Sequence, residues 1–81
     1  MSANTRFLEF ITKPGCHLCD DALPLVQAAA GEVGLEVVER SVLDDDRLMI
    51  EFGLRIPVVL QDGVVVAEGI ISEADLEGLA G

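Results

Sequence analysis

The sequence predicts a small α/β domain in which a four-stranded mixed sheet carries helices on both faces. The chain has 81 residues, of which 51% are hydrophobic, and this suits one globular domain over residues 1–81. Strand-like and helix-like apolar segments follow in the order strand, helix, strand, helix, strand, strand, helix. The last two strand-like segments flank Asp62-Gly63, a two-residue turn typical of a tight antiparallel hairpin.

The first strand is expected over residues 6–12, an apolar run rich in strand formers that ends at the turn signal Lys13-Pro14-Gly15. A helix should follow and stop at Ala30-Gly31. Pro24 lies inside this helix and should kink it or cost about 3 kcal/mol. The apolar face of the helix is predicted from residues at helical spacing: Leu18, Ala22, Leu25, Val26 and Ala29.

The second strand, over residues 35–42, carries charges that suit the edge of a sheet, where they discourage stray pairing. The run Asp44-Asp45-Asp46 should begin a short second helix that ends at Gly53. We interpret these carboxylates as helix-capping groups, not as a metal site, because a first turn favours negative charge. The inner face of this helix is predicted to hold Leu48, Met49 and Phe52.

The last two strands are expected over residues 57–61 and 64–68, and a final helix should begin at Ser72 with Asp75 as its capping partner. Leu76 and Leu79 would form the apolar face of that helix. Because the first two strands are joined by a helix, they require a right-handed crossover and should pair in parallel.

The charge balance excludes several classes of partner. The net charge is −10, and the basic residues are scattered, so the chain has no surface suited to nucleic acid or to anionic lipid. No apolar run is long enough to cross a bilayer, and residues 1–6 do not begin a signal peptide, so we expect a cytoplasmic protein. The basic residues are Arg6, Lys13, Arg40, Arg47 and Arg55.

The chemistry is predicted to reside in Cys16-His17-Leu18-Cys19, at the change from strand to helix. Free N–H groups and the dipole of a helix N-terminus favour a thiolate at Cys16, whereas Cys19 lies one turn later and should be more covered. Cys16 should therefore attack a disulfide, and Cys19 should resolve the mixed disulfide. A protonated His17 would favour the thiolate further, and the carboxylates of Asp20 and Asp21 would oppose it.

Two other interpretations of the cysteine pair stay open. A zinc or iron–sulfur site needs four ligands, and the chain offers two thiols and one histidine, so a metal carrier would have to be a dimer. A fold of this kind could also act without catalysis, as a peptide-binding module whose thiols sense redox state. We expect a monomer with no metal and no bound cofactor.

Thr12-Lys13-Pro14-Gly15-Cys16 with Cys19 resembles the active-site entrance of glutaredoxins, and the length and element order agree over nearly the whole chain. Residues 51–57 resemble the thioredoxin segment that leads into a cis-proline, and residues 69–76 a thioredoxin ending. Pro24 stands where thioredoxins carry a kink proline. The chain is therefore identified as a divergent bacterial glutaredoxin-like protein of the thioredoxin-fold superfamily.

This resemblance implies a thiol–disulfide oxidoreductase that acts on protein disulfides or on glutathione mixed disulfides. Ile56-Pro57 should be a cis peptide that faces the cysteines, with the backbone beside it pairing to an extended substrate. Glutathione is a candidate co-substrate, and glutathione or a thioredoxin reductase a candidate reductant. Arg47 and Arg55 are weaker candidates than Lys13 for holding a glutathione carboxylate. The substrate-binding residues implied are Lys13, His17, Ile56, Pro57 and Gly69.

Two departures from glutaredoxins favour protein disulfides as substrates. Leu18 stands where glutaredoxins carry an aromatic residue. Gly69 is followed by Ile70-Ile71 instead of the paired glycines and aspartates that hold the glutamyl end of glutathione.

Overall fold

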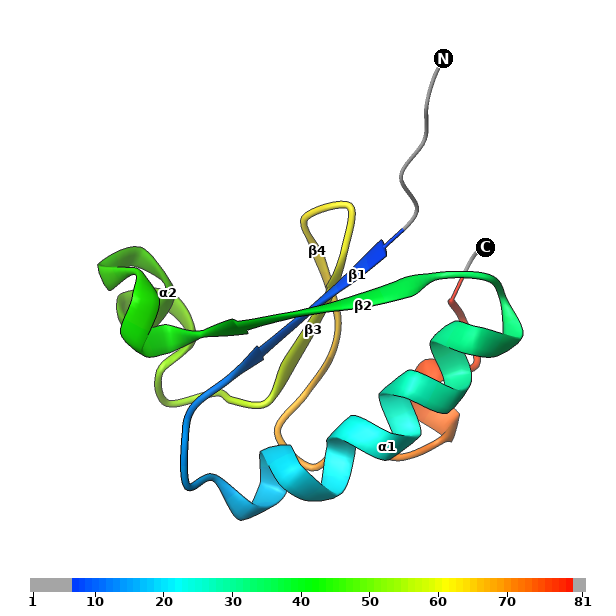
Figure 1. Cartoon of the computed structure of the whole chain (residues 1–81), viewed down its shortest axis with the longest axis horizontal. Coiled ribbons are helices and arrows are strands. Elements are labelled where there is room, and N and C mark those ends of the chain that lie inside the picture. The colour runs from blue at the N-terminus through cyan, green and yellow to red at the C-terminus, as the bar shows by residue number, and fades with distance from the viewer. Residues whose placement is uncertain (1–6, 80–81) are drawn as a thin grey trace.

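The structure, a computed structural model, describes residues 7–79 and contains one four-stranded sheet in the order β2-β1-β3-β4 (Figure 1). β1 pairs in parallel with β2, and β3 is antiparallel to β1 and to β4, so the predicted mixed sheet is confirmed. Arg6 and the segment judged for a signal peptide lie outside the described residues. The strands are Phe7–Thr12 (β1), Glu36–Ser41 (β2), Val58–Gln61 (β3) and Val64–Glu68 (β4).

Two α-helices, His17–Glu32 (α1) and Asp46–Phe52 (α2), accompany the sheet, together with two short 3₁₀ turns, Val42–Asp44 (η1) and Ala74–Leu76 (η2). None of the helices described in residues 7–79 is long and apolar enough to span a bilayer.

The two faces of the sheet carry separate apolar clusters, as the alternation of side chains along β1 requires. Leu8 and Phe10 pack against α1 and η2, whereas Ile11 points to the other face and packs with Phe52 of α2. All three β1 side chains are at most 1% exposed. The predicted helices on both faces are therefore present, and β1 lies at the centre of both cores.

Helix α1 differs from its prediction in the placement of Leu18 and in its last residue. Cys19, Ala22, Val26 and Ala30 form its buried face, while Leu18 is 45% exposed. Leu18 was expected on that face, but Cys19 takes the core position and the neighbouring residue is turned by about 100° around the helix axis. The helix runs through Pro24 and ends at Glu32, and Gly34 then adopts a positive φ of 77°.

The final helix is shorter than predicted. Oδ2 of Asp75 accepts hydrogen bonds from the Ser72 amide at 2.9 Å and from its hydroxyl at 3.1 Å. The N-cap residue of η2 is nevertheless Glu73, not the predicted Ser72, and it makes no side-chain capping hydrogen bond. Only η2 follows, and the 3₁₀ turn ends at Leu76. Gly78 lies where the next turn would form, and glycine disfavours a helix by about 1 kcal/mol relative to alanine.

The second helix is capped as predicted, because the Asp45 carboxylate accepts a hydrogen bond from the Arg47 amide at 2.8 Å. Phe52 is buried and Leu48 packs beside it, but Met49 is 40% exposed and does not belong to the inner face. A helix of two turns presents so narrow a buried face that these two residues fill it.

The hairpin and the edge strand agree with the sequence pattern. Asp62 and Gly63 have φ values of 53° and 79°, the left-handed conformations that a type I′ turn requires. β2 is an edge strand, and Arg40 Nε lies 2.8 Å from Glu9 Oε2 on the neighbouring β1.

Shortening a fully buried side chain of β1 should destabilise the domain measurably. For Ile11→Val we expect a loss of about 0.5–1.5 kcal/mol in the free energy of unfolding, because a cavity replaces one methyl group. Ile50→Val, at a side chain that is 84% exposed, is the matched control and should change stability by less than about 0.5 kcal/mol. Urea unfolding followed by circular dichroism measures both. Equal effects of the two substitutions would contradict the assignment of β1 to the core.

Candidate functional site

The two cysteines occupy different environments at the start of α1. The chain turns after β1 through Gly15, with φ of 79°, and the Cys16 amide donates to the Lys13 carbonyl at 3.3 Å. Cys16 is then the N-cap residue, and its Sγ accepts a hydrogen bond from the Cys19 amide at 3.2 Å. Cys16 is half-buried, Cys19 is 2% exposed, and both are free thiols. The predicted capping position of Cys16 is confirmed.

The sulfur of Cys16 thus accepts a hydrogen bond from one of the N–H groups that have no main-chain partner at a helix N-terminus. A hydrogen bond from an amide is stronger when its acceptor is charged, so the Cys19 amide is placed to bind a negatively charged sulfur at Cys16. Asp20 carries the opposing negative charge in the first turn of the same helix.

Cys19 is held in its protonated form. Burial raises the pKa of its thiol above the ordinary value of 9.0, and the hydrogen bond with the Cys16 side chain raises it further. Hydrogen bonds from the Thr12 side chain and the Lys13 backbone act in the opposite direction and lower the pKa in part. Thr12 was not among the predicted site residues. Its position as the last residue of the strand before the cysteine pair was the available signal.

The loop before β3 lies at the same end of the sheet as the cysteines. The Ile56-Pro57 peptide is cis, as the resemblance implies. Val58 pairs with Ile11 in the antiparallel register, so Pro57 lies beside the end of β1, from which the chain leads to Cys16. Cys16 and Ile56 pack against the same apolar cluster. The antiparallel pairing of β1 and β3 therefore brings the dithiol turn and the cis-proline loop to the same end of the sheet.

The start of β3 is tied to the segment that follows β4. The Gly69 amide donates to the Pro57 carbonyl at 2.8 Å, and Gly69 has a positive φ of 72°. The structure thus places Ile56, Pro57 and Gly69 together, and it places Lys13 and His17 on the exposed surface next to Cys16 in the chain. The substrate-binding roles of these residues stay predictions.

Arg55 is engaged in an interaction that the sequence did not suggest. Its Nε and Nη2 atoms donate to the two carboxylate oxygens of Glu68 at 2.7 and 3.2 Å, and its guanidinium lies 5.2 Å from the centre of the Phe52 ring. The hydrogen bonds raise the pKa of Arg55 and lower the pKa of Glu68. This pair fastens the cis-proline loop to the end of β4. It also leaves Arg55 a poorer candidate than Lys13 for binding a carboxylate of glutathione.

Within residues 7–79, no group of three or more histidine, cysteine, aspartate or glutamate side chains is arranged to hold a metal ion. The three consecutive aspartates fall in different local structures. Asp44 ends η1, Asp45 caps α2, and Asp46 is the first residue of that helix.

Comparison with known proteins places the chain in a family. The sequence profile of the glutaredoxin-like domain (DUF836) matches residues 7–80. The chain belongs to this glutaredoxin-like family. No curated protein matches it. The family model spans both cysteines, the cis-proline loop and η2, so the glutaredoxin-like domain includes the whole candidate site.

Solved structures agree on the fold of this glutaredoxin-like domain. A structural-genomics target protein from X. campestris is 28% identical, with a TM-score of 0.68 over 85% of this chain and 88% of that one. A mutant thioredoxin from Halobacterium salinarum is 27% identical, with a TM-score of 0.63 over 90% of this chain and 69% of that one. Thioredoxin 1 from Thermosipho africanus, 16% identical with a TM-score of 0.56 over 80% and 76%, shares the fold.

The difference in exposure predicts which cysteine reacts first. Iodoacetamide in limiting amount should modify Cys16 of the reduced protein before Cys19, because the thiol of Cys19 is buried and protonated. Mass spectrometry of the digested protein gives the site. The Cys16→Ser variant should react on the order of tenfold more slowly than Cys19→Ser. Equal rates in these two matched variants would contradict the assignment of roles.

The raised pKa of Cys19 also predicts a loss of stability in alkali. The folded thiol releases its proton at higher pH than the unfolded one, so its contribution is complete below the ordinary pKa of 9.0. It is lost as the pH rises from there through the folded pKa. The reduced protein should therefore become less stable above about pH 9.

The chain suits this measurement because it has no tyrosine that would titrate in the same range. Urea unfolding under reducing conditions between about pH 7.5 and 10 gives the slope. In Cys19→Ser the slope should be shallower than in the unchanged protein. The same slope in both proteins would assign the alkaline destabilisation to other groups.

Proposed function

We propose that this glutaredoxin-like domain is a thiol–disulfide oxidoreductase in which Cys16 attacks and Cys19 resolves. The observation that carries the proposal is the asymmetry of the pair: Cys16 is partly exposed and its sulfur accepts an amide hydrogen bond, while Cys19 is buried one turn later. A nucleophilic thiol must be both accessible and able to become a thiolate. Cys19 fails the first condition because it is buried, and its raised pKa works against the second.

In the first step the Cys16 thiolate attacks one sulfur of a substrate disulfide. The substrate S–S bond breaks, a bond forms between Cys16 and one half of the substrate, and the other half leaves as a thiolate. The Cys19 amide stabilises the negative charge on Cys16 before the attack. Cys19 stays out of this step because its raised pKa keeps it a thiol.

In the second step Cys19 loses its proton to the leaving thiolate or to water, and its sulfur attacks Cys16. The mixed disulfide breaks, the second substrate thiolate leaves, and a Cys16–Cys19 disulfide forms. The substrate has gained two electrons and the domain has lost two. The hydrogen bonds from Thr12 and Lys13 that lower the pKa of Cys19 assist this deprotonation. A thiol reductant, glutathione or a thioredoxin reductase system, must then restore the dithiol.

Protein disulfides are the substrate class that the site supports better. The Pro57 carbonyl is occupied by the Gly69 amide, whereas Ile56 makes no main-chain hydrogen bond to another described residue. An extended peptide could therefore pair with the Ile56 backbone beside Cys16. The carboxylates of glutathione would find few cations here, because Arg55 is paired with Glu68. Monomeric state and cytoplasmic location stay predictions.

The decisive experiment offers the oxidised protein reduced glutathione and a thioredoxin reductase system in parallel, and then couples each reductant to turnover of a disulfide-bonded test protein such as insulin. We expect catalytic turnover with at least one reductant. Cys16→Ser should lower the rate to the uncatalysed level. Cys19→Ser should still attack and should accumulate as a mixed disulfide that mass spectrometry detects.

Reduction by neither system would contradict the proposal. Stoichiometric capture of a disulfide without turnover would instead support the redox-sensing module. A metal or chromophore retained after anaerobic purification would support the dimeric carrier.

A further inference from the structure

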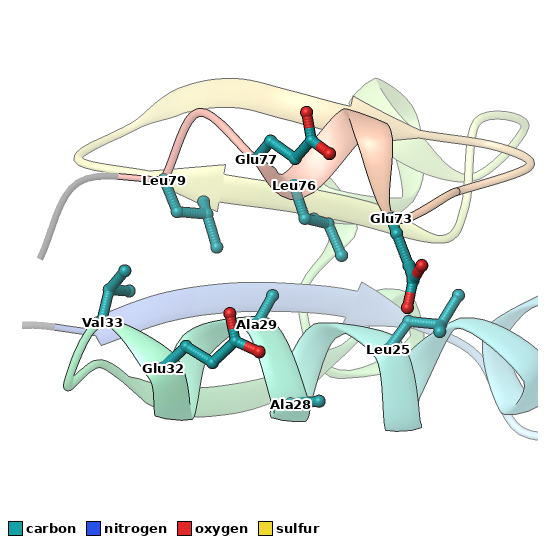
Figure 2. A pocket seen from close by; sticks show the side chains of 9 residues that line it. All are labelled: Leu25, Ala28, Ala29, Glu32, Val33, Glu73, Leu76, Glu77 and Leu79. Carbon is teal, nitrogen blue, oxygen red and sulfur yellow. The ribbon is translucent and has the colours of Figure 1, made fainter.

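A second surface feature lies on the other half of α1, away from the dithiol. A groove with a volume of about 380 Å³ separates the C-terminal half of α1 from η2, and Figure 2 shows its two walls facing each other. Its first lining residue, Leu25, follows Cys16 by nine positions, or about 13 Å along the helix axis. The lining residues are Leu25, Ala28, Ala29, Glu32, Val33, Glu73, Leu76, Glu77 and Leu79.

The walls of the groove are aliphatic and incompletely covered. In Figure 2 the side chains of Leu76 and Leu79 point from η2 and the following residues toward α1, while Leu25 of α1 and Val33, the residue after α1, point toward them. Three of these side chains, Leu25, Val33 and Leu79, are only partly buried. The gap remains because α1 offers the small side chain of Ala29 at its centre and because η2 is a single turn.

Two carboxylates, from Glu32 and Glu73, flank this apolar space. Figure 2 shows Glu73, the residue before η2, reaching toward Leu25 at one end, and the Glu32 carboxylate turned along α1 toward Ala29. Both glutamates are exposed, and neither forms an ion pair with another described residue. None of the basic residues described in the structure lines the groove. Of these, Arg40 pairs with Glu9 and Arg55 with Glu68.

We propose that this groove docks a segment of a protein partner that carries aliphatic side chains between two basic residues. Leu25 and Val33 are eight residues apart, which is about 12 Å along a helix, and in an extended segment residues four apart span about 13 Å. Lysines or arginines that flank such a segment could reach Glu73 and Glu32 while the aliphatic side chains between them fill the apolar space. The negative charge of these two carboxylates selects a basic partner.

A second copy of this chain fits less well, because each copy carries a net charge of −10 and would repel the other. An anionic membrane is disfavoured for the same reason. The proposal concerns binding alone and does not depend on the reaction of Cys16 and Cys19, so its failure would leave the oxidoreductase proposal standing.

The test titrates isotope-labelled protein with the peptide acetyl-Lys-Leu-Ala-Leu-Lys-amide and follows backbone amide shifts by NMR. Shifts should be confined to residues 25–33 and 73–79. The double variant Glu32→Gln, Glu73→Gln should bind about tenfold more weakly, since two partly exposed ion pairs are lost. The matched control, Glu36→Gln with Glu39→Gln on the exposed edge of β2, removes the same charge and should bind as the unchanged protein does.

Three results would overturn the proposal: no saturable shifts, equal binding of the acidic peptide acetyl-Glu-Leu-Ala-Leu-Glu-amide, or equal weakening by the two double variants. Ala29→Leu should also block binding by filling the groove, provided that circular dichroism shows a folded protein. If that variant unfolds, the two glutamine double variants decide the question.

Discussion

The central position of β1 is the constraint on which the rest of the structure depends. Its main chain is hydrogen-bonded on both sides, in parallel to β2 and antiparallel to β3, and its side chains enter both apolar clusters. Because β3 runs antiparallel to β1, the start of β3 and the turn that follows β1 lie at the same end of the sheet. The cysteines and the cis-proline loop are neighbours for this reason, although about forty residues separate them in the sequence.

The order of elements and the dithiol could be predicted because their signals are local. The Asp62-Gly63 turn, the capping carboxylate of Asp45 and the Cys16 position each depend on a few adjacent residues. The outcomes that differ depend on packing. The sequence predicted that Cys19 would be covered, and this is confirmed, but it also placed Leu18 on the apolar face, and only the packing of α1 shows that Leu18 turns outward.

Interactions between distant segments could not be predicted from the sequence either, because they too depend on how the elements pack. The pairing of Arg55 with Glu68 joins residues from different elements, and nothing in either local pattern identifies the partner. The groove beside Ala29 depends on how far η2 extends, and η2 ends at Leu76, shortly before the helix-breaking Gly78. Such features become visible only when the backbone is placed in space.

Cys19 has a role in packing and a role in the dithiol site. Its side chain packs in the same apolar cluster as Phe10 and Val26, and its amide donates a hydrogen bond to the Cys16 sulfur. A side chain at this position must fill apolar volume and supply a thiol, and cysteine is the one standard residue that does both. Substitution of Cys19 is therefore limited by both requirements, the packing volume and the thiol. Alanine would keep much of the packing without the redox chemistry, and any larger apolar residue would lose the chemistry and crowd the core. A sequence that retains Cys16 but replaces Cys19 would mark a protein working through one thiol alone.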